Sequence, residues 1–222
     1  MIGESFAYAK EAVVGKWNKW FMLIIATLIL TIPLYGYILK IYRGEKPAPE
    51  VDNWGTLFVD GIKMIIIGII YAIPLFILQF LMMGSLIGGA MMNDPSTAAA
   101  GMAGAGILFI VYIIVAIIIG LIAPIGIIRF ARSGSMGEAF NFSAILATIG
   151  KIGWISYIIA LIIVALVIGI PVAIIWVVLL ALIFALSLVG MLIAAIVFLV
   201  IIPPIAILEA RYLSQIYDSA GA

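Results

Sequence analysis

Residues 152–208 read IGWISYIIALIIVALVIGIPVAIIWVVLLALIFALSLVGMLIAAIVFLVIIPPIAIL, and no charged side chain interrupts these 57 positions. A helix needs about 20 apolar residues to cross a membrane. Two helices of about 28 residues would each measure about 42 Å, well above the ~30 Å hydrocarbon core. Three helices of about 18 residues fit better, so we expect breaks at 169–171 and 187–190.

The rest of the chain has the same character. Of its 222 residues, 67% are hydrophobic and only 9% are charged, whereas soluble domains are about 45–50% apolar and about 25% charged. A water-soluble fold could not cover this much apolar surface. The sequence therefore predicts a multi-pass membrane protein.

Three more apolar segments precede the uncharged run. They cover residues 20–39, 64–90 and 107–128, and a polar connector, residues 43–63, follows the first of them. We therefore predict an all-α, polytopic membrane helix bundle of about six hydrophobic segments.

Two pairs of similar motifs predict an internal duplication. GESFAYAKEAVVGKWNKW (3–20) resembles GEAFNFSAILATIGKIGW (137–154), and APIGIIRFAR (123–132) resembles PPIAILEAR (203–211). Since both pairs occur in the same order, we predict two pseudo-repeated halves, 1–132 and 133–222. The second half begins with the GEAFNF lead-in.

The first lead-in has the pattern of a helix lying in the membrane interface. One face of its helical wheel is apolar: Phe6, Ala9, Val13, Trp17 and Trp20. Lys10 and Lys16 lie at the edges of that face, where long side chains can extend to the headgroups. The second lead-in is less polar, and we expect it to pack against protein.

Aromatic and basic side chains favour the membrane–water boundary. On that basis we predict eight interfacial or lipid-contacting residues: Phe6, Lys10, Lys16, Trp17, Trp20, Trp54, Phe58 and Trp154.

The connector carries the densest polar pattern of the chain. We predict that five of its residues form a polar rim: Arg43, Glu50, Asp52, Asp60 and Lys63. Asp60 and Lys63 can meet on one helix face because they are three residues apart. The rim could recognise a headgroup, a solute or a partner, or it could simply anchor the helices at a fixed depth.

Glycine and proline inside apolar segments indicate helix packing. Gly allows close approach of helices in lipid, and Pro frees a carbonyl that a neighbour must satisfy. The predicted packing residues are Gly84, Gly88, Gly120, Pro124 and Pro204. Homo-oligomerisation through the glycine faces is a natural hypothesis.

The orientation has two solutions. If all six segments cross, residues 1–19 lie on the opposite side from residues 40–63. Alternatively, the first segment is re-entrant, turns near residues 33–36, and leaves every Lys/Arg cluster on one side, as the positive-inside rule favours. The side on which Ser5 lies relative to Ala48 distinguishes the two.

The connector also resembles a known family. LYGYILKIYRGEKPAPEVDNWGTLFVDGIKMIIIGIIYAIP is similar to the signature of the DUF4013 family, uncharacterised membrane proteins mainly of methanogenic archaea. The matching positions are Gly36, Tyr37, Arg43, Gly44, Pro49, Glu50, Asp52, Trp54, Leu57, Phe58, Asp60, Gly61 and Lys63. The lead-in GEAFNF and a terminal pattern of Ala210, Arg211 and Tyr217 look similar too. The resemblance implies an archaeal cytoplasmic membrane but supplies no activity.

Functional chemistry is sparse in this sequence. The chain has no Cys and no His, so we expect no catalytic site, no cofactor and no metal centre, and its net charge of +1 gives no reason to expect nucleic acid. Glu209 is the lone carboxylate near a span, and we expect Arg211 to be its exposed neighbour.

Two functions fit this pattern. The first is a structural or accessory membrane protein, namely a scaffold, a lipid organiser or a complex subunit, with membrane lipids and further copies or subunits as partners. The second is a transporter or channel for an apolar or lipid-like molecule.

Overall fold

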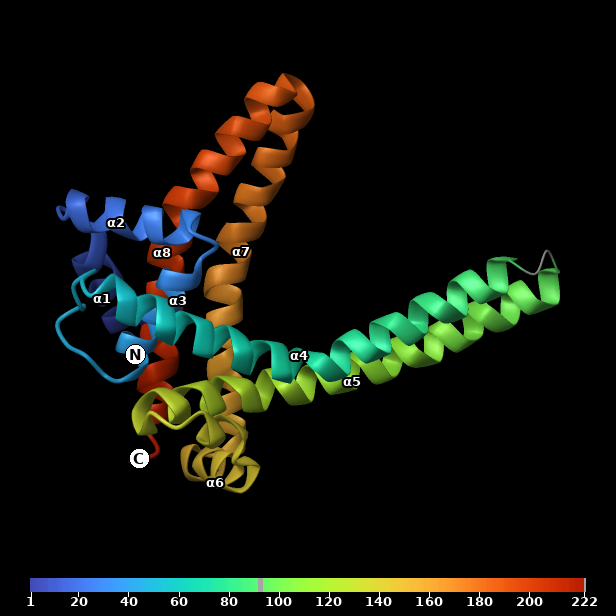
Figure 1. Cartoon of the computed structure of the whole chain (residues 1–222), viewed down its shortest axis with the longest axis horizontal. Coiled ribbons are helices and arrows are strands. Elements are labelled where there is room, and N and C mark those ends of the chain that lie inside the picture. Colours follow the sequence, from blue (N-terminus) through green and yellow to red (C-terminus); the bar gives the residue numbers. More distant parts are fainter. Residues whose placement is uncertain (92–93, 222) are drawn as a thin grey trace. The chain divides into compact units, whose positions relative to one another are not determined.

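The computed structural model describes residues 1–91 and 94–221, and in that part of the chain the regular structure is entirely helical (Figure 1). The elements are α1 (Ile2–Val13), α2 (Trp17–Leu28), α3 (Ile32–Tyr42), α4 (Trp54–Met91), α5 (Pro95–Ser133), the 3-10 helix η1 (Met136–Phe140), α6 (Phe142–Ile152), α7 (Trp154–Leu186) and α8 (Leu188–Asp218). The all-α prediction is confirmed.

The chain forms two compact units, which are described separately. Unit 1 comprises residues 1–65 and 125–222, and unit 2 comprises residues 66–124. The boundary passes through the continuous helices α4 and α5. The two pseudo-repeated halves, divided at residue 132, are a different kind of division and stay a prediction.

Helix α8 is the shared packing element of unit 1. It contacts α1, α2, α3, α6 and α7, and Figure 1 shows the N-terminal helices gathered beside it. Its C-terminal part is buried from Ala210 to Tyr217, although it contains Arg211, Ser214 and Gln215. Polar residues at the end of a hydrophobic helix are thus enclosed by protein.

The prediction that residues 20–39 form one span is wrong. Helix α2 ends at Leu28 and α3 begins at Ile32, because Leu30 and Thr31 adopt left-handed backbone conformations with φ of 52° and 63°. Pro33 lies in the first turn of α3, where its missing N–H costs little. At about 18 and 16 Å, the two helices are each too short to cross a membrane.

The uncharged run contains two helices rather than three. The break predicted at 187–190 is confirmed at Ser187, where φ is 49°, but the break predicted at 169–171 is wrong because Pro171 lies inside α7. Proline removes one backbone hydrogen bond, whereas ending a helix leaves about four carbonyls unpaired. In an apolar environment, continuing the helix is the less costly solution.

The described residues hold four helices that are long and apolar enough to cross a membrane: α4, α5, α7 and α8. The six-segment count is therefore not confirmed. The difference comes from the divided first segment and from the unbroken α7.

The single N-terminal interfacial helix is also corrected. Helix α1 ends at Val13, so Trp17 and Trp20 belong to α2. Within α1, Ala9 and Val13 are buried in unit 1, where α1 packs on α8, and Phe6 is exposed. One part of its apolar face therefore packs against protein, and another part is exposed.

The second lead-in packs against protein, as expected. Helix α6 contacts α7 and α8 and buries Ile145 and Ile149 completely. Its start is capped by Asn141, whose Oδ1 accepts a hydrogen bond of 3.2 Å from the backbone N–H of Ala144.

Helices α3 and α4 approach each other at two glycines. A Cβ added at Gly36 would lie 2.0 Å from the carbonyl oxygen of Leu57, and one at Gly61 would lie 1.9 Å from that of Ile32. Only a residue without a side chain fits at either position. These glycines fix how the start of α4 lies on α3.

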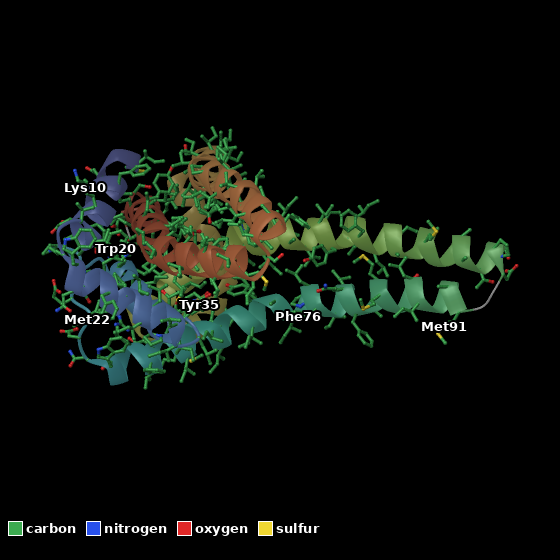
Figure 2. All side chains as sticks on the ribbon, turned by 90° about the horizontal axis from the view of Figure 1, so that it is seen from above. Lys10, Trp20, Met22, Tyr35, Phe76 and Met91 are labelled. Atoms are coloured by element: carbon green, nitrogen blue, oxygen red, sulfur yellow. The ribbon has the colours of Figure 1, made fainter. Side chains whose placement is uncertain are left out.

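Unit 2 is a helical hairpin built from the C-terminal part of α4 and the N-terminal part of α5 (Figure 2). The two helices approach closely at Gly89 and Gly101, and the Ser85 hydroxyl donates a hydrogen bond of 2.9 Å to the Gly101 carbonyl. The predicted packing glycines Gly84, Gly88 and Gly120 have open space where a side chain would project. They do not pack within the hairpin.

Candidate functional site

The connector is held by side chains that reach its backbone from three helices. Four of its carbonyl oxygens accept hydrogen bonds: Glu45 from Tyr8 (2.9 Å), Ala48 from Lys19 (2.9 Å), Pro49 from Tyr37 (2.9 Å) and Glu50 from Lys40 (3.3 Å). A buried irregular segment needs partners for its backbone groups. These side chains supply them, so the connector has a defined path.

All five predicted rim residues are engaged in ion pairs. Asp60 accepts from Arg43 (2.6 Å) and lies 3.8 Å from Lys63, while Glu50 pairs with Lys19 (3.2 Å) and Asp52 with Lys40 (2.5 Å). The i,i+3 pairing of Asp60 and Lys63 is confirmed. Since the charges neutralise one another, the geometry favours the anchoring interpretation of the rim.

The environment shifts the pKa values of these groups. Burial lowers the pKa of Lys19, whereas its hydrogen bond to Glu50 opposes that change. The hydrogen bond and charge of Lys40 hold the pKa of Asp52 below its usual value. Burial raises the pKa of Tyr8 to about 12, with the charge of Arg211 acting in the opposite direction.

The connector also settles how α1, α2 and α3 are arranged. Tyr8 of α1, Lys19 near the start of α2 and Tyr37 of α3 all bond to residues 45–49. Helices α2 and α3 therefore start and end beside the connector, as in the re-entrant alternative. The turn between them lies at Leu30–Thr31 instead of 33–36. This geometry favours the re-entrant alternative over full crossing, and the membrane side of each end stays a prediction.

Arg132 is a central residue that sequence reasoning missed. Its Nε donates to the carbonyl of Tyr42 (2.5 Å), and its Nη2 donates to Asp218 (2.6 Å) and to Ser214 (3.2 Å). The guanidinium also lies 5.7 Å from the centroid of the Tyr217 ring. One side chain thus joins the ends of α3, α5 and α8, and only its place in the APIGIIRFAR motif singled it out.

Two more basic residues are enclosed by protein. Arg129 pairs with Glu138, whose pKa is lowered first by a hydrogen bond from Asn141 and then by that from Arg129. Arg211 is buried, with its guanidinium 5.0 Å from the centroid of the Tyr8 ring. The expectation that Arg211 is exposed is therefore wrong.

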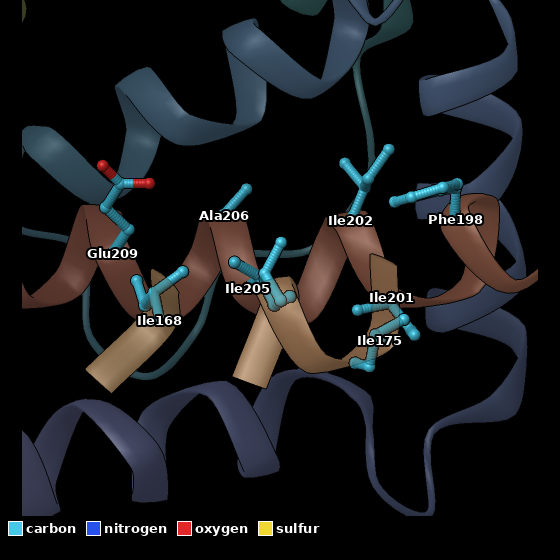
Figure 3. Close-up of a pocket in the computed structure, with 9 residues that line it drawn as sticks. Ile168, Ile175, Phe198, Ile201, Ile202, Ile205, Ala206 and Glu209 are labelled. Carbon is cyan, nitrogen blue, oxygen red and sulfur yellow. The ribbon is translucent and has the colours of Figure 1, made fainter. Parts of the chain in front are cut away.

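An apolar groove of about 330 Å³ lies between α7 and α8 (Figure 3). Isoleucines from both helices line it, including Ile168, Ile175 and Ile202, and the carboxylate of Glu209 lies at one end. Figure 3 shows Phe198, Ile202, Ala206 and Glu209 following one another along α8. The groove thus combines a long apolar wall with one acidic group.

A family match covers most of the chain, including the connector and the whole of the second lead-in. The model of DUF4013, described as a protein of unknown function, matches residues 20–183. The chain belongs to the DUF4013 family. No curated protein and no solved structure matches the chain.

The residues matched by the DUF4013 model can be placed on the fold. The match includes the connector and the GEAFNF lead-in, and it ends before α8, so the pattern of Ala210, Arg211 and Tyr217 lies outside it. In this DUF4013 protein, Gly36 and Gly61 of the signature are the two points of backbone contact between α3 and α4. Several signature positions thus have a structural explanation.

The predicted interfacial residues of this DUF4013 chain occupy different environments. The apolar side chains of Phe6, Trp17 and Trp154 are exposed. The basic residues Lys10 and Lys16 are exposed as well. Trp54 and Phe58, at the start of α4, are half-buried. Contact of these residues with lipid stays a prediction.

Trp20 has a role that its position in the sequence did not reveal. Its ring stacks on Trp17 with centroids 5.6 Å apart, and its Nε1 donates a hydrogen bond of 3.2 Å to the carbonyl of Val200. In a regular helix that carbonyl would accept from residue 204, which is Pro204 and has no N–H. Trp20 therefore satisfies the carbonyl that the proline frees, as expected for a packed apolar helix.

Proposed function

We propose that this DUF4013 protein is an integral membrane protein without catalytic chemistry, acting as a structural or accessory component: a lipid-organising scaffold or a subunit of a membrane complex. The observation that carries the proposal is a contrast in surface chemistry. The five rim residues are paired with one another or with Lys19 and Lys40, whereas only 6% of the residues in the most apolar stretches of α5 and α7 are buried. The surface left for partners is therefore apolar.

Four crossings account for the distribution of charge. All eleven Lys and Arg residues lie within residues 10–63 and 129–211, and neither turn between consecutive long helices, near Asp94 and Ser187, has one nearby. With α2 and α3 re-entrant, every positive charge falls on one side, which the positive-inside rule assigns to the cytoplasm. The N- and C-termini lie together in unit 1, since Ser5 and Glu4 both contact Gln215.

Accessibility labelling tests this topology. Ser5 and Ala48 are buried, so the labels are placed at exposed neighbours. Cysteines introduced singly at Glu11, Lys46 and Ser219 should react from the cytoplasmic side, and one at Ser96 or Ser187 should react from the opposite side. The chain has no native Cys, so each label reports one position. Labelling of Glu11→Cys and Lys46→Cys from opposite sides would contradict the re-entrant arrangement.

Self-assembly follows from the unused glycine face of the hairpin. Gly84 and Gly88 are one helical turn apart and have open space beside them, which suits close approach by another helix in lipid. The mass of the purified protein in mild detergent should be that of a defined oligomer. A Gly84→Leu/Gly88→Leu variant should become monomeric, whereas Gly68→Leu, about 160° away from Gly84 around α4, should not. A monomeric wild-type particle would contradict assembly.

The groove between α7 and α8 favours a second candidate function. A transporter for an apolar or lipid-like molecule needs an apolar path at membrane depth, and the groove is lined that way. Reconstitution with a fluorescent lipid analogue tests it, because transport predicts movement between leaflets that a scaffold would not produce.

The internal duplication and the archaeal cytoplasmic membrane belong to the same proposal. The motif pairs support the first and the DUF4013 signature supports the second. A common ancestor of the halves predicts that lead-ins and helix ends will align in divergent family sequences.

A further inference from the structure

The apolar groove ends at a carboxylate without a partner. Within residues 1–91 and 94–221, Glu209 forms neither an ion pair nor a hydrogen bond, although Asp60, Glu50 and Asp52 are all paired. A carboxylate beside apolar surface is costly unless it gains a charge-assisted partner. Glu209 is an exposed residue at the end of the groove, and it lacks the ion-pair partner that each of those three acids has.

Two arginines packed at the C-terminal part of α8 face groups other than Glu209, although Nη1 of Arg211 has no hydrogen-bond partner. Arg211 has its guanidinium over the ring of Tyr8, and Arg132 bonds to Tyr42, Ser214 and Asp218. The element packed beside this end of α8 contributes the phenol of Tyr42, a neutral group whose pKa is raised by burial and then by the charge of Glu209. No Lys or Arg among the described residues forms an ion pair with Glu209, so its carboxylate is open to a cation from outside the chain.

The shape of the groove restricts the rest of that ligand. A volume of about 330 Å³ is at the lower end of small-molecule sites. Phe198, Ile202 and Ala206 precede Glu209 on the same side of α8 (Figure 3), so an extended apolar chain can lie along them with its polar end at Glu209. One chain fits this description better than a two-chain lipid.

We propose that the groove binds a single-chain cationic amphiphile, with its ammonium head donating hydrogen bonds to the Glu209 carboxylate and its apolar chain lying on Ile202, Ile205 and Ile168. The proposal rests on the membrane location proposed above and names the lipid-like class that the protein would hold. It is independent of whether the protein self-assembles.

The test uses the full-length protein in lipid nanodiscs and three photoreactive probes. Each probe has the same sixteen-carbon chain with a diazirine, and the chains end in an ammonium, a hydroxyl or a carboxylate group. After irradiation, mass spectrometry of peptides measures labelling of residues 168–209. The ammonium probe should label this segment about tenfold more than the hydroxyl probe, as a charge-assisted contact in an apolar site would produce, and the carboxylate probe should label it least.

Three variants distinguish the groove from nonspecific partition into the bilayer. Glu209→Gln should reduce labelling by the ammonium probe to that of the hydroxyl probe, whereas Glu209→Asp should retain part of the preference. Ile202→Trp, which fills the groove, should reduce labelling by both probes. Glu11→Gln removes an exposed carboxylate of α1 and should change nothing.

Two results would overturn the proposal. One is equal labelling of residues 168–209 by the ammonium and hydroxyl probes in the wild-type protein. The other is an ammonium preference that survives Glu209→Gln in a variant whose particle mass and helical circular dichroism match the wild type. Loss of oligomeric mass with intact labelling would instead count only against the scaffold function.

Discussion

Residues 1–63 of unit 1, which we call the connector end, are held together by polar contacts, whereas the hairpin of unit 2 presents mainly apolar side chains. All the Lys and Arg residues lie in unit 1, whereas Asp94 is the single charged residue in unit 2. At the connector, hydrogen bonds and ion pairs give each segment a specific partner. In the hairpin, large apolar side chains such as Phe76, Phe80 and Phe109 are exposed, so lipid or other protein must cover them.

The difference shows that hydrophobicity and specific contacts determine different features of the fold. Hydrophobicity alone places a helix in the membrane and leaves its neighbours open. Polar contacts and close glycine approaches determine which segments meet. Substitutions in the connector end should therefore disturb assembly of the fold, and substitutions in the hairpin should act locally.

The largest effect is expected where α3 touches α4. In Gly36→Ala or Gly61→Ala, the new Cβ would collide with a backbone carbonyl about 2 Å away, and backbone cannot rotate aside as a side chain can. We expect a loss in unfolding free energy of about 3 kcal/mol or more, measured by titration with SDS in mixed micelles. Gly55→Ala is the matched control, because nothing lies within 4 Å of that position in α4. Equal stability of Gly36→Ala and Gly55→Ala would refute this account of the contact.

The next effect concerns Arg132. Arg132→Lys keeps the charge but cannot bond to Tyr42, Ser214 and Asp218 at once, since an ammonium lacks the planar fork of a guanidinium. We expect a loss of about 2 kcal/mol, the scale of one or two charge-assisted hydrogen bonds, and faster hydrogen exchange in the last turns of α3 and α8. Lys151→Met removes an exposed charge and should leave exchange unchanged. Unaltered exchange in Arg132→Lys would show that the three contacts do not hold the helix ends together.

A smaller effect is expected from the pair of stacked tryptophans. Trp20→Phe retains an aromatic ring but leaves the Val200 carbonyl without its donor, so we expect a loss of about 1–2 kcal/mol, the cost of one unsatisfied buried polar group. Trp17→Phe alters a ring that is 72% exposed and should cost much less. The SDS titration compares the two. A loss as large for Trp17→Phe would indicate that stacking, and not the hydrogen bond, stabilises this region.

These residues also show how far sequence reasoning extends. The membrane class, the helical fold and the break at Ser187 could be predicted, because they depend on composition and on local backbone signals. The interruption at Leu30–Thr31 could not, since no glycine marks it and its cause is the way residues 17–42 meet the connector. Pro171 and Pro204 both lie in apolar sequence and cannot be told apart from it. The carbonyl that Pro204 frees, that of Val200, accepts a hydrogen bond from Trp20, a residue far away in the sequence. The five rim residues could be named from the sequence. The pairing of two of them with Lys19 and Lys40 could not be predicted, because it depends on the tertiary fold.

The smallest expected effect lies in the hairpin, at Asp94. Its carboxylate accepts hydrogen bonds from the backbone N–H (3.0 Å) and hydroxyl (2.8 Å) of Thr97, as well as from Ser96, and these bonds lower its pKa to about 2. A value below the ordinary 3.8 means that the cap contributes fully above about pH 4 and is lost as the pH falls through about 2. The protection of the Thr97 amide, measured as its exchange rate relative to the intrinsic rate at each pH, should therefore decrease at low pH in the wild type. In Asp94→Asn, which keeps an acceptor but cannot titrate, Thr97 should lose this pH dependence, while exchange in α3 stays as in the wild type. A change in α3 would contradict the view that the hairpin responds locally, and with it the contrast between the two regions.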